Sequence, residues 1–156
     1  MTEMFKTSLA LACAATMLSG CAGEWAADSH APADYKTSYT RITDKCDKSN
    51  SHGGKYVHTY ISAGGLDAWK AGTAVPKGTV LIKEGYADSG CTEVIEHWTM
   101  KKIDDKGDIK DWNWQTLDEY GSINQQDQSA MGGCAGCHTS YKASDYIGTP
   151  APATGT

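Results

Sequence analysis

Residues 134–138 read Cys-Ala-Gly-Cys-His and constrain the fold of this chain more than any other stretch. The pattern C-x-x-C-H is that of covalent c-type haem attachment. Two thiols at this spacing can each bond a haem vinyl group, and the histidine that follows then lies against the ring, where its imidazole can bind iron. We therefore expect Cys134 and Cys137 to hold one covalent haem c, with His138 as the proximal iron ligand.

Two other uses of a C-x-x-C pair have to be compared with haem attachment. A redox-active dithiol does not need the adjoining histidine, and it is expected between a strand and a helix near the start of a domain. This motif instead lies near the C-terminus. A structural zinc site needs a second ligand pair at a matching spacing, which the sequence does not show. Haem attachment is the favoured interpretation.

The N-terminus has the features of an export signal. Lys6 gives a weakly basic start, and an apolar run over residues 7–17 is too short for a permanent membrane span. Residues 18–21 (Leu-Ser-Gly-Cys) resemble the lipobox of bacterial lipoprotein signals, which are cleaved before the cysteine. We expect a lipoprotein signal over residues 1–20 and lipidation of Cys21, with an ordinary signal cleaved after Ala27 as the alternative.

Lipidation of Cys21 predicts a location on the periplasmic side of a bacterial membrane. Ala22 gives no inner-membrane retention signal, so the outer membrane is favoured, and the lipid anchor is then the membrane contact. The chain has 14 basic and 19 acidic residues, a net charge of −5 and no basic run. This balance argues against nucleic acid as a partner.

Cys46 and Cys91 remain once the signal, the lipid site and the haem motif are assigned. An exported protein can pair two such cysteines. A bridge would close a loop of 45 residues (91 − 46) and contribute about 4 kcal/mol of stability in the chain-entropy model. Two free buried thiols are the alternative.

The rest of the chain predicts an α+β fold, mostly an antiparallel β-sheet with a few short helices before the C-terminal haem motif. Strands are expected where β-branched and aromatic residues gather, over 56–61, 79–84, 92–102 and 111–117. Helices are expected over 65–71, 122–131 and, after His138, through Tyr146. The folded domain is expected over 35–147, after a flexible tether over 21–34 and before a disordered tail over 148–156.

Residues 76–84 (Pro-Lys-Gly-Thr-Val-Leu-Ile-Lys-Glu) resemble the GTV-x-V-K-E strand of the cytochrome P-460 family. A tryptophan-bearing helix at 66–69, a hydrophobic-Lys pair at 100–101, a strand beginning at 111–112 and the haem motif follow the family's order, from about 55 to 146. The resemblance implies a sheet-rich mono-haem domain, typically a homodimer. The family is related to the cytochrome c-prime-beta proteins, which bind gases on a five-coordinate haem.

The resemblance also implies roles for single residues. Cys134 and Cys137 match the thioether cysteines, and His138 matches the proximal ligand. Lys83 matches the lysine that the P-460 enzymes bond to the porphyrin edge. Such a bond requires a neutral amine, hence a buried lysine with a lowered pKa. An ordinary strand lysine that faces solvent, as in relatives without the cross-link, is the alternative.

On the distal side, the family's hydroxylamine-oxidising enzymes carry a carboxylate as proton acceptor. His97 stands at that position with Glu96 beside it, and neighbouring strand residues point to opposite faces. We expect His97 to act as proton acceptor or sixth iron ligand, or Glu96 to take the role if the register slips by one. Either can instead be an ordinary strand residue. His58 is a weaker axial candidate, and His30 and His52 are expected at the surface.

Three functions follow. In the first, which the resemblance favours, hydroxylamine or a related small nitrogen compound is oxidised at an open haem iron, and a periplasmic acceptor takes the electrons. The resemblance by itself does not establish that the protein is an enzyme. In the second, the same pocket binds nitric oxide. In the third, His97 or Met100 provides a sixth ligand and the protein is an electron carrier.

Overall fold

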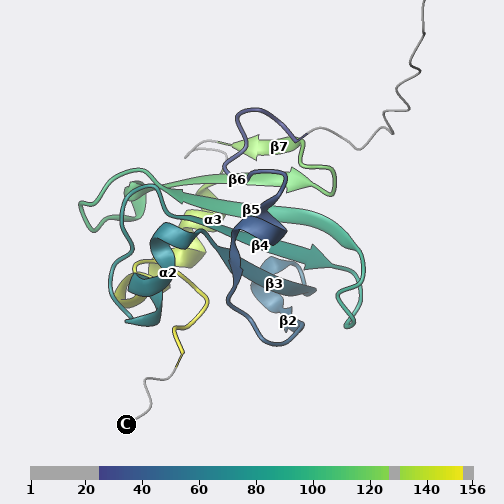
Figure 1. Cartoon of the computed structure of the whole chain (residues 1–156), viewed down its shortest axis with the longest axis horizontal. Helices are drawn as coiled ribbons and strands as arrows, with labels where there is room; N and C mark the ends of the chain where they lie inside the picture. The colour runs from purple at the N-terminus through teal and green to yellow at the C-terminus, as the bar shows by residue number, and fades with distance from the viewer. Residues whose placement is uncertain (1–24, 127–130, 153–156) are drawn as a thin grey trace, which may run out of the picture.

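A seven-stranded antiparallel sheet forms the body of the protein in a computed structural model that describes residues 25–126 and 131–152 (Figure 1). The strands are β1 (Thr40–Arg41), β2 (Asp47–Ser49), β3 (Lys55–Ile61), β4 (Val80–Tyr86), β5 (Val94–Lys102), β6 (Trp112–Asp118) and β7 (Ile123–Gln126). They lie in the order β1-β3-β4-β5-β6-β7, and β2 also pairs with β3. The expected α+β fold is confirmed.

The helical elements are short. They are α1 (Tyr35–Ser38), α2 (Ala63–Lys70), α3 (Gly132–His138) and the 3-10 turns η1 (Asn50–His52), η2 (Ile109–Asp111) and η3 (Thr139–Ser144). Helices α2 and α3 lie on the same side of the sheet (Figure 1). No helix within the described ranges is long and apolar enough to cross a membrane.

Both faces of the central strands are buried, and each faces its own hydrophobic cluster. On one face, Leu81 and Met100 pack with Trp69 of α2 and with residues that flank α3. On the other face, Val80 and Ile82 pack with Tyr35 of α1 and the segment before it. This two-sided burial explains why β4 reads as a nearly continuous apolar run.

Three expectations about the elements are wrong. Residues 122–131 were expected as a helix, but residues 123–126 form β7, because the edge of β6 offers unpaired backbone groups that β7 satisfies; residues 127–130 lie outside the described ranges. Residues 25–34 were expected as a flexible tether, but the Ala26 N–H donates to the Gly121 carbonyl and Ala31 is buried. Residues 148–152 were expected in a disordered tail, but the Trp69 indole N–H donates to the Thr149 carbonyl and the Thr149 hydroxyl bonds to Thr59; residues 153–156 lie outside the described ranges.

Candidate functional site

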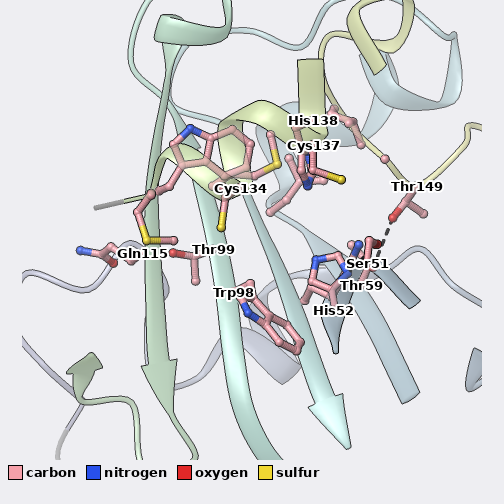
Figure 2. Close-up of a pocket in the computed structure, with 18 residues that line it drawn as sticks. Ser51, His52, Thr59, Trp98, Thr99, Gln115, Cys134, Cys137, His138 and Thr149 are labelled. Carbon is pink, nitrogen blue, oxygen red and sulfur yellow. Dashed lines mark hydrogen bonds between the residues drawn. The ribbon is translucent and has the colours of Figure 1, made fainter. Parts of the chain in front are cut away.

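A cavity of about 750 Å³, counting the part open to solvent, lies between α3 and the α2 side of the sheet (Figure 2). The helix contributes Cys134, Cys137 and His138. The strands contribute apolar and polar side chains, and the loop before β3 and the segment after η3 close the sides. The lining residues outside α3 include Ser51, His52, Thr59, Leu81, Lys83, Trp98, Met100, Trp114, Met131, Ile147 and Thr149.

His138 is held in the orientation that an iron ligand needs. Its Nδ1 lies 2.7 Å from the Tyr146 carbonyl oxygen, to which an Nδ1–H can donate, so that Nε2 is left with its lone pair. The ring also meets Trp114 edge to face, with centroids 4.8 Å apart. Burial lowers the pKa of His138, although the bond to Tyr146 opposes the shift. The imidazole is therefore neutral, which is the form that binds metal.

Cys134 and Cys137 lie one turn apart on α3, and both thiols are unpaired. Burial raises the pKa of Cys134. The indole N–H of Trp114, a residue that also lines the cavity, is buried and has no hydrogen-bond partner among the described residues. Two thiols, an imidazole with one free nitrogen and a mostly apolar cavity are the donor set that a covalent haem requires. The residues present therefore fit a haem.

Lys83 lies in the middle of the cavity face of the sheet. In the strand register it stands between Thr59 of β3 and Trp98 of β5. Burial lowers the pKa of its amine to about 8. The adjacent Gly85 leaves room for the Trp98 ring, since a Cβ there would lie 2.7 Å from it. The structure thus places Lys83 in the cavity and not in solvent.

His97 lies on the other face of the sheet, which contradicts its expected distal role. It is buried, its Nδ1 lies 2.9 Å from the Asp118 carbonyl oxygen and its Nε2 lies 3.1 Å from the Tyr35 hydroxyl. The reason is register: β5 pairs Trp98 with Lys83 and His97 with Glu84. His97 therefore can be neither a sixth ligand nor a proton acceptor in this cavity.

Glu96 lies on the cavity side of β5 but its carboxylate turns away from the cavity. It forms an ion pair with Lys55 at 2.6 Å and does not line the cavity. Among the described lining residues there is no carboxylate. The distal carboxylate that the family resemblance led us to expect is thus not matched by either candidate.

His52, expected at the surface, lines the cavity (Figure 2). Its Nδ1 lies 2.8 Å from the Ser49 hydroxyl, and its ring meets Trp98 edge to face at 4.7 Å. Burial lowers the pKa of His52 to about 3, with the positive charge of Lys83 adding to the shift, so the imidazole is neutral. The position of His52 could not be predicted from the sequence, because it lies in a polar 3-10 turn and only the packing of η1 against Trp98 of β5 buries it.

The remaining histidines lie away from the cavity. His58 shares the face of Glu84, because β3 pairs these two residues, so it is not an axial candidate. His30 is partly buried on the same side, with its Nδ1 3.2 Å from the Thr99 hydroxyl, and is not a surface residue. Cys46 and Cys91 are joined by a disulfide.

Fold and cavity together define a β-sheet haem protein of the cytochrome class. The family model for cytochrome P-460 matches residues 32–149, and the chain belongs to that family. A search of the curated proteins finds no match. The sheet, the cavity wall and the C-x-x-C-H helix all lie within the matched range.

Proposed function

We propose that this protein is an exported mono-haem c-type cytochrome that oxidises hydroxylamine or a related small nitrogen compound at an open haem iron. Cys134 and Cys137 hold the haem through thioether bonds, and His138 is the proximal ligand. The haem supplies the redox chemistry, and a periplasmic acceptor takes the electrons. The observation that carries the proposal is the position of Lys83 in the cavity with its lowered pKa.

The lowered pKa of the Lys83 amine favours a covalent bond between this side chain and the porphyrin edge. With a pKa of about 8, roughly a tenth of the amine is neutral at pH 7, several hundred times the fraction of an ordinary lysine. A neutral amine is the nucleophilic form. Such a bond is what distinguishes the P-460 enzymes from the gas-binding relatives in this family.

His52 is the residue that we assign to a hydrogen bond with the bound substrate. It is a neutral histidine on the cavity wall, with Nδ1 bonded to Ser49 and Nε2 left over. With a pKa of about 3 the side chain is too weak a base to hold a proton at pH 7, so its role is to orient the substrate through Nε2. The electrons leave through the haem.

Nitric oxide binding is the second candidate. It is favoured by the apolar character of the lining, which includes Leu81, Trp98, Met100 and Ile147, and by the lack of a carboxylate among the described lining residues. An apolar pocket of this kind can hold a diatomic gas without performing chemistry on it.

An absorption spectrum of the purified protein, oxidised and then reduced with dithionite, tests the proposal. A broad, red-shifted ferrous Soret band that disappears in Lys83→Met is the expected result. An ordinary high-spin c-type spectrum would mean no cross-link and would favour nitric oxide binding. A sharp low-spin spectrum would mean a sixth protein ligand, and the protein would then be an electron carrier.

Hydroxylamine turnover tests the role of His52. We expect His52→Ala to lower kcat/KM by about tenfold, since it removes one hydrogen bond to the substrate. Glu96→Ala is the matched control and should stay within a few-fold of wild type, because its carboxylate is paired with Lys55. Normal turnover by His52→Ala would contradict the assignment.

The proposal includes a lipid anchor at Cys21, a position on the periplasmic side of the outer membrane and assembly as a homodimer. The signal and Cys21 lie outside the described residues. Mass spectrometry of the N-terminal peptide from membrane fractions, and the mass of the detergent-solubilised protein in solution, test these points. An unmodified N-terminus after Ala27 would replace the lipoprotein with a secreted form.

A further inference from the structure

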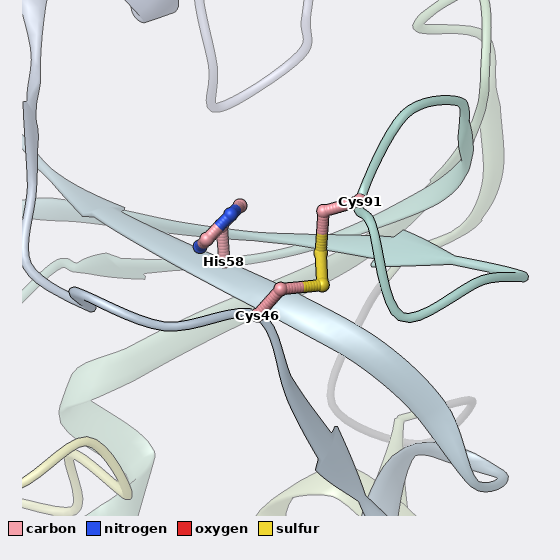
Figure 3. A group of neighbouring side chains, drawn as sticks. All are labelled: Cys46, His58 and Cys91. Atoms are coloured by element: carbon pink, nitrogen blue, oxygen red, sulfur yellow. A yellow bond between two sulfur atoms is a disulfide. The ribbon is translucent and has the colours of Figure 1, made fainter.

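A second cluster of metal-binding side chains lies on the face of the sheet opposite the haem cavity. One ligand atom from each of Cys46, His58 and Cys91 lies within 4.8 Å of the other two (Figure 3). Donor atoms arranged in a triangle around a metal at about 2.3 Å lie about 4 Å apart. The distances from the His58 nitrogen to the sulfurs therefore need only a small contraction, while the two sulfurs, bonded in the disulfide, move apart to about 4 Å once they are thiolates.

We propose that reduction of the Cys46 to Cys91 disulfide converts this cluster into a three-coordinate Cu⁺ site. A dithiol reductant gives two electrons to the disulfide and becomes a disulfide itself, and the two sulfurs take up two protons. Cu⁺ then displaces those two protons and binds both thiolates and the His58 imidazole. The disulfide form, which the structure shows, is the metal-free state.

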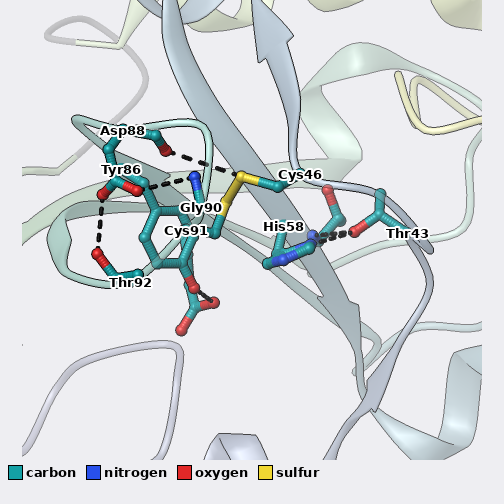
Figure 4. Close-up of a disulfide and its surroundings, with 10 residues drawn as sticks. Thr43, Cys46, His58, Tyr86, Asp88, Gly90, Cys91 and Thr92 are labelled. Carbon is teal, nitrogen blue, oxygen red and sulfur yellow. Dashed lines mark hydrogen bonds between the residues drawn. A yellow bond between two sulfur atoms is a disulfide. The ribbon is translucent and has the colours of Figure 1, made fainter.

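All three groups are also held in place by contacts other than the disulfide, so the site persists after reduction. Because β2 pairs Asp47 with Val57 in an antiparallel register, the preceding Cys46 falls opposite His58. The turn that carries Cys91 is fastened by the Asp88 carboxylate, which accepts hydrogen bonds from the Gly90 N–H and the Thr92 hydroxyl (Figure 4).

His58 is prepared as a ligand. It is buried, and its Nδ1 lies 3.2 Å from the Thr43 hydroxyl, which itself accepts a bond from the Thr59 N–H (Figure 4). When Nδ1 carries the proton, Nε2 is free for a metal, and a partner of this kind is typical of metal-bound histidine. Burial lowers the pKa of His58, with Arg41 adding to the shift and the Glu84 and Asp47 carboxylates opposing it.

The donor set favours Cu⁺ over Zn²⁺. Thiolate is a soft ligand that selects Cu⁺, for which three donors suffice, whereas structural Zn²⁺ sites almost always have four. The neighbouring carboxylate of Asp88 is already engaged by its own turn. Within the described residues, the cluster thus contains three donors and no fourth.

Titration with Cu⁺ in competition with a chromophoric Cu⁺ chelator tests the site. Wild-type protein is reduced with dithiothreitol, desalted without oxygen and compared with Cys46→Ser/Cys91→Ser, so that copper bound by other cysteines cancels. We expect one more Cu⁺ per chain in the reduced wild type. We expect at least a tenfold weaker affinity in His58→Gln, and no extra copper in the disulfide form. His30→Gln is the matched histidine control and should bind as wild type does.

X-ray absorption at the copper edge provides a second readout, expected to show two sulfur neighbours and one nitrogen neighbour. Equal copper uptake by reduced wild type and the double-serine variant would overturn the site. If that variant does not fold, equal uptake by reduced and disulfide-bonded wild type would overturn it. Sulfur neighbours alone would remove His58 from the site, and stronger binding of Zn²⁺ than of Cu⁺ would overturn the assignment of the metal.

Discussion

Glu84 shows how the side of the sheet away from the haem cavity holds a charge in its interior. Its side chain is fully buried, yet the hydroxyls of Tyr35 and Tyr86 donate to the carboxylate, and the Lys36 ammonium lies 2.9 Å from Oε1. Burial by itself would raise the pKa of Glu84, but these three donors together hold it below its ordinary value. The carboxylate is therefore stabilised in its ionised form.

Replacing Glu84 by Gln should destabilise the protein in a pH-dependent way. Because the pKa of Glu84 is depressed in the folded state, its stabilisation is present above the unfolded pKa and is lost as the pH falls through the folded value. We expect Glu84→Gln to lower the free energy of unfolding by about 2 kcal/mol at pH 7, and the difference from wild type to shrink at pH 4 and below. Urea unfolding measures both.

Glu93→Gln, in an exposed position, is the control for that comparison and should leave stability unchanged. An effect of Glu84→Gln that is the same at both pH values would show that the carboxylate charge does not matter. The tyrosines alone would then account for the burial of this side chain.

At the scale of elements, a buried ion pair ties the segment after the haem motif to β5. Lys102 Nζ lies 2.5 Å from Asp145 Oδ1, and both side chains are almost completely buried. Asp145 Oδ2 also accepts the Val75 N–H, and the lysine lies over the Trp112 ring at 4.9 Å. Since Tyr146 follows directly and its carbonyl orients His138, this ion pair positions the proximal side of the site.

Asp145→Asn should cost about 3–5 kcal/mol in the free energy of unfolding, because it leaves the Lys102 charge buried without its partner. It should also shift the haem spectrum through the Tyr146 to His138 contact. Lys106→Met removes an exposed ion pair with Asp104 and is the control, with no measurable change expected. Equal effects of the two variants on urea unfolding would contradict the structural role of Asp145.

At the scale of the whole molecule, the disulfide joins the start of β2 to the loop between β4 and β5. It closes a loop of 45 residues that contains β3, α2 and β4. We expect Cys46→Ala/Cys91→Ala to lower the free energy of unfolding by about 4 kcal/mol, because the unfolded chain regains the entropy of that loop. Urea unfolding of variant and wild type, each under non-reducing conditions, measures the difference.

The same experiment on reduced wild type is the control, and it should reproduce the loss. An intact mass that does not gain two hydrogen atoms on reduction would show that the bridge is not formed in the purified protein. A stable double-alanine variant would mean that sheet pairing alone holds this part of the chain.

Local signals in the sequence were sufficient for most of the sheet. Strands β3 to β6 follow runs of β-branched and aromatic residues, and α2 follows the Leu66 and Trp69 spacing, so their positions agree with expectation to within a few residues. β7 was missed because its polar residues have little strand propensity of their own and become a strand only by pairing with β6. The packing of Trp25 was not predicted, because it depends on ring contacts with Tyr35 and His97, which are distant in sequence.

Local patterns in the sequence were enough to identify the C-x-x-C-H helix, the Lys83 strand and the family. Which face of the sheet meets that helix depends on packing between segments that are distant in the chain. Because both faces of the central strands are buried, alternation along β5 separated His97 from Glu96 but could not say which of them faces the cavity. The register with β4 turns His97 away, and packing of η1 against Trp98 brings in His52, which no local pattern marks.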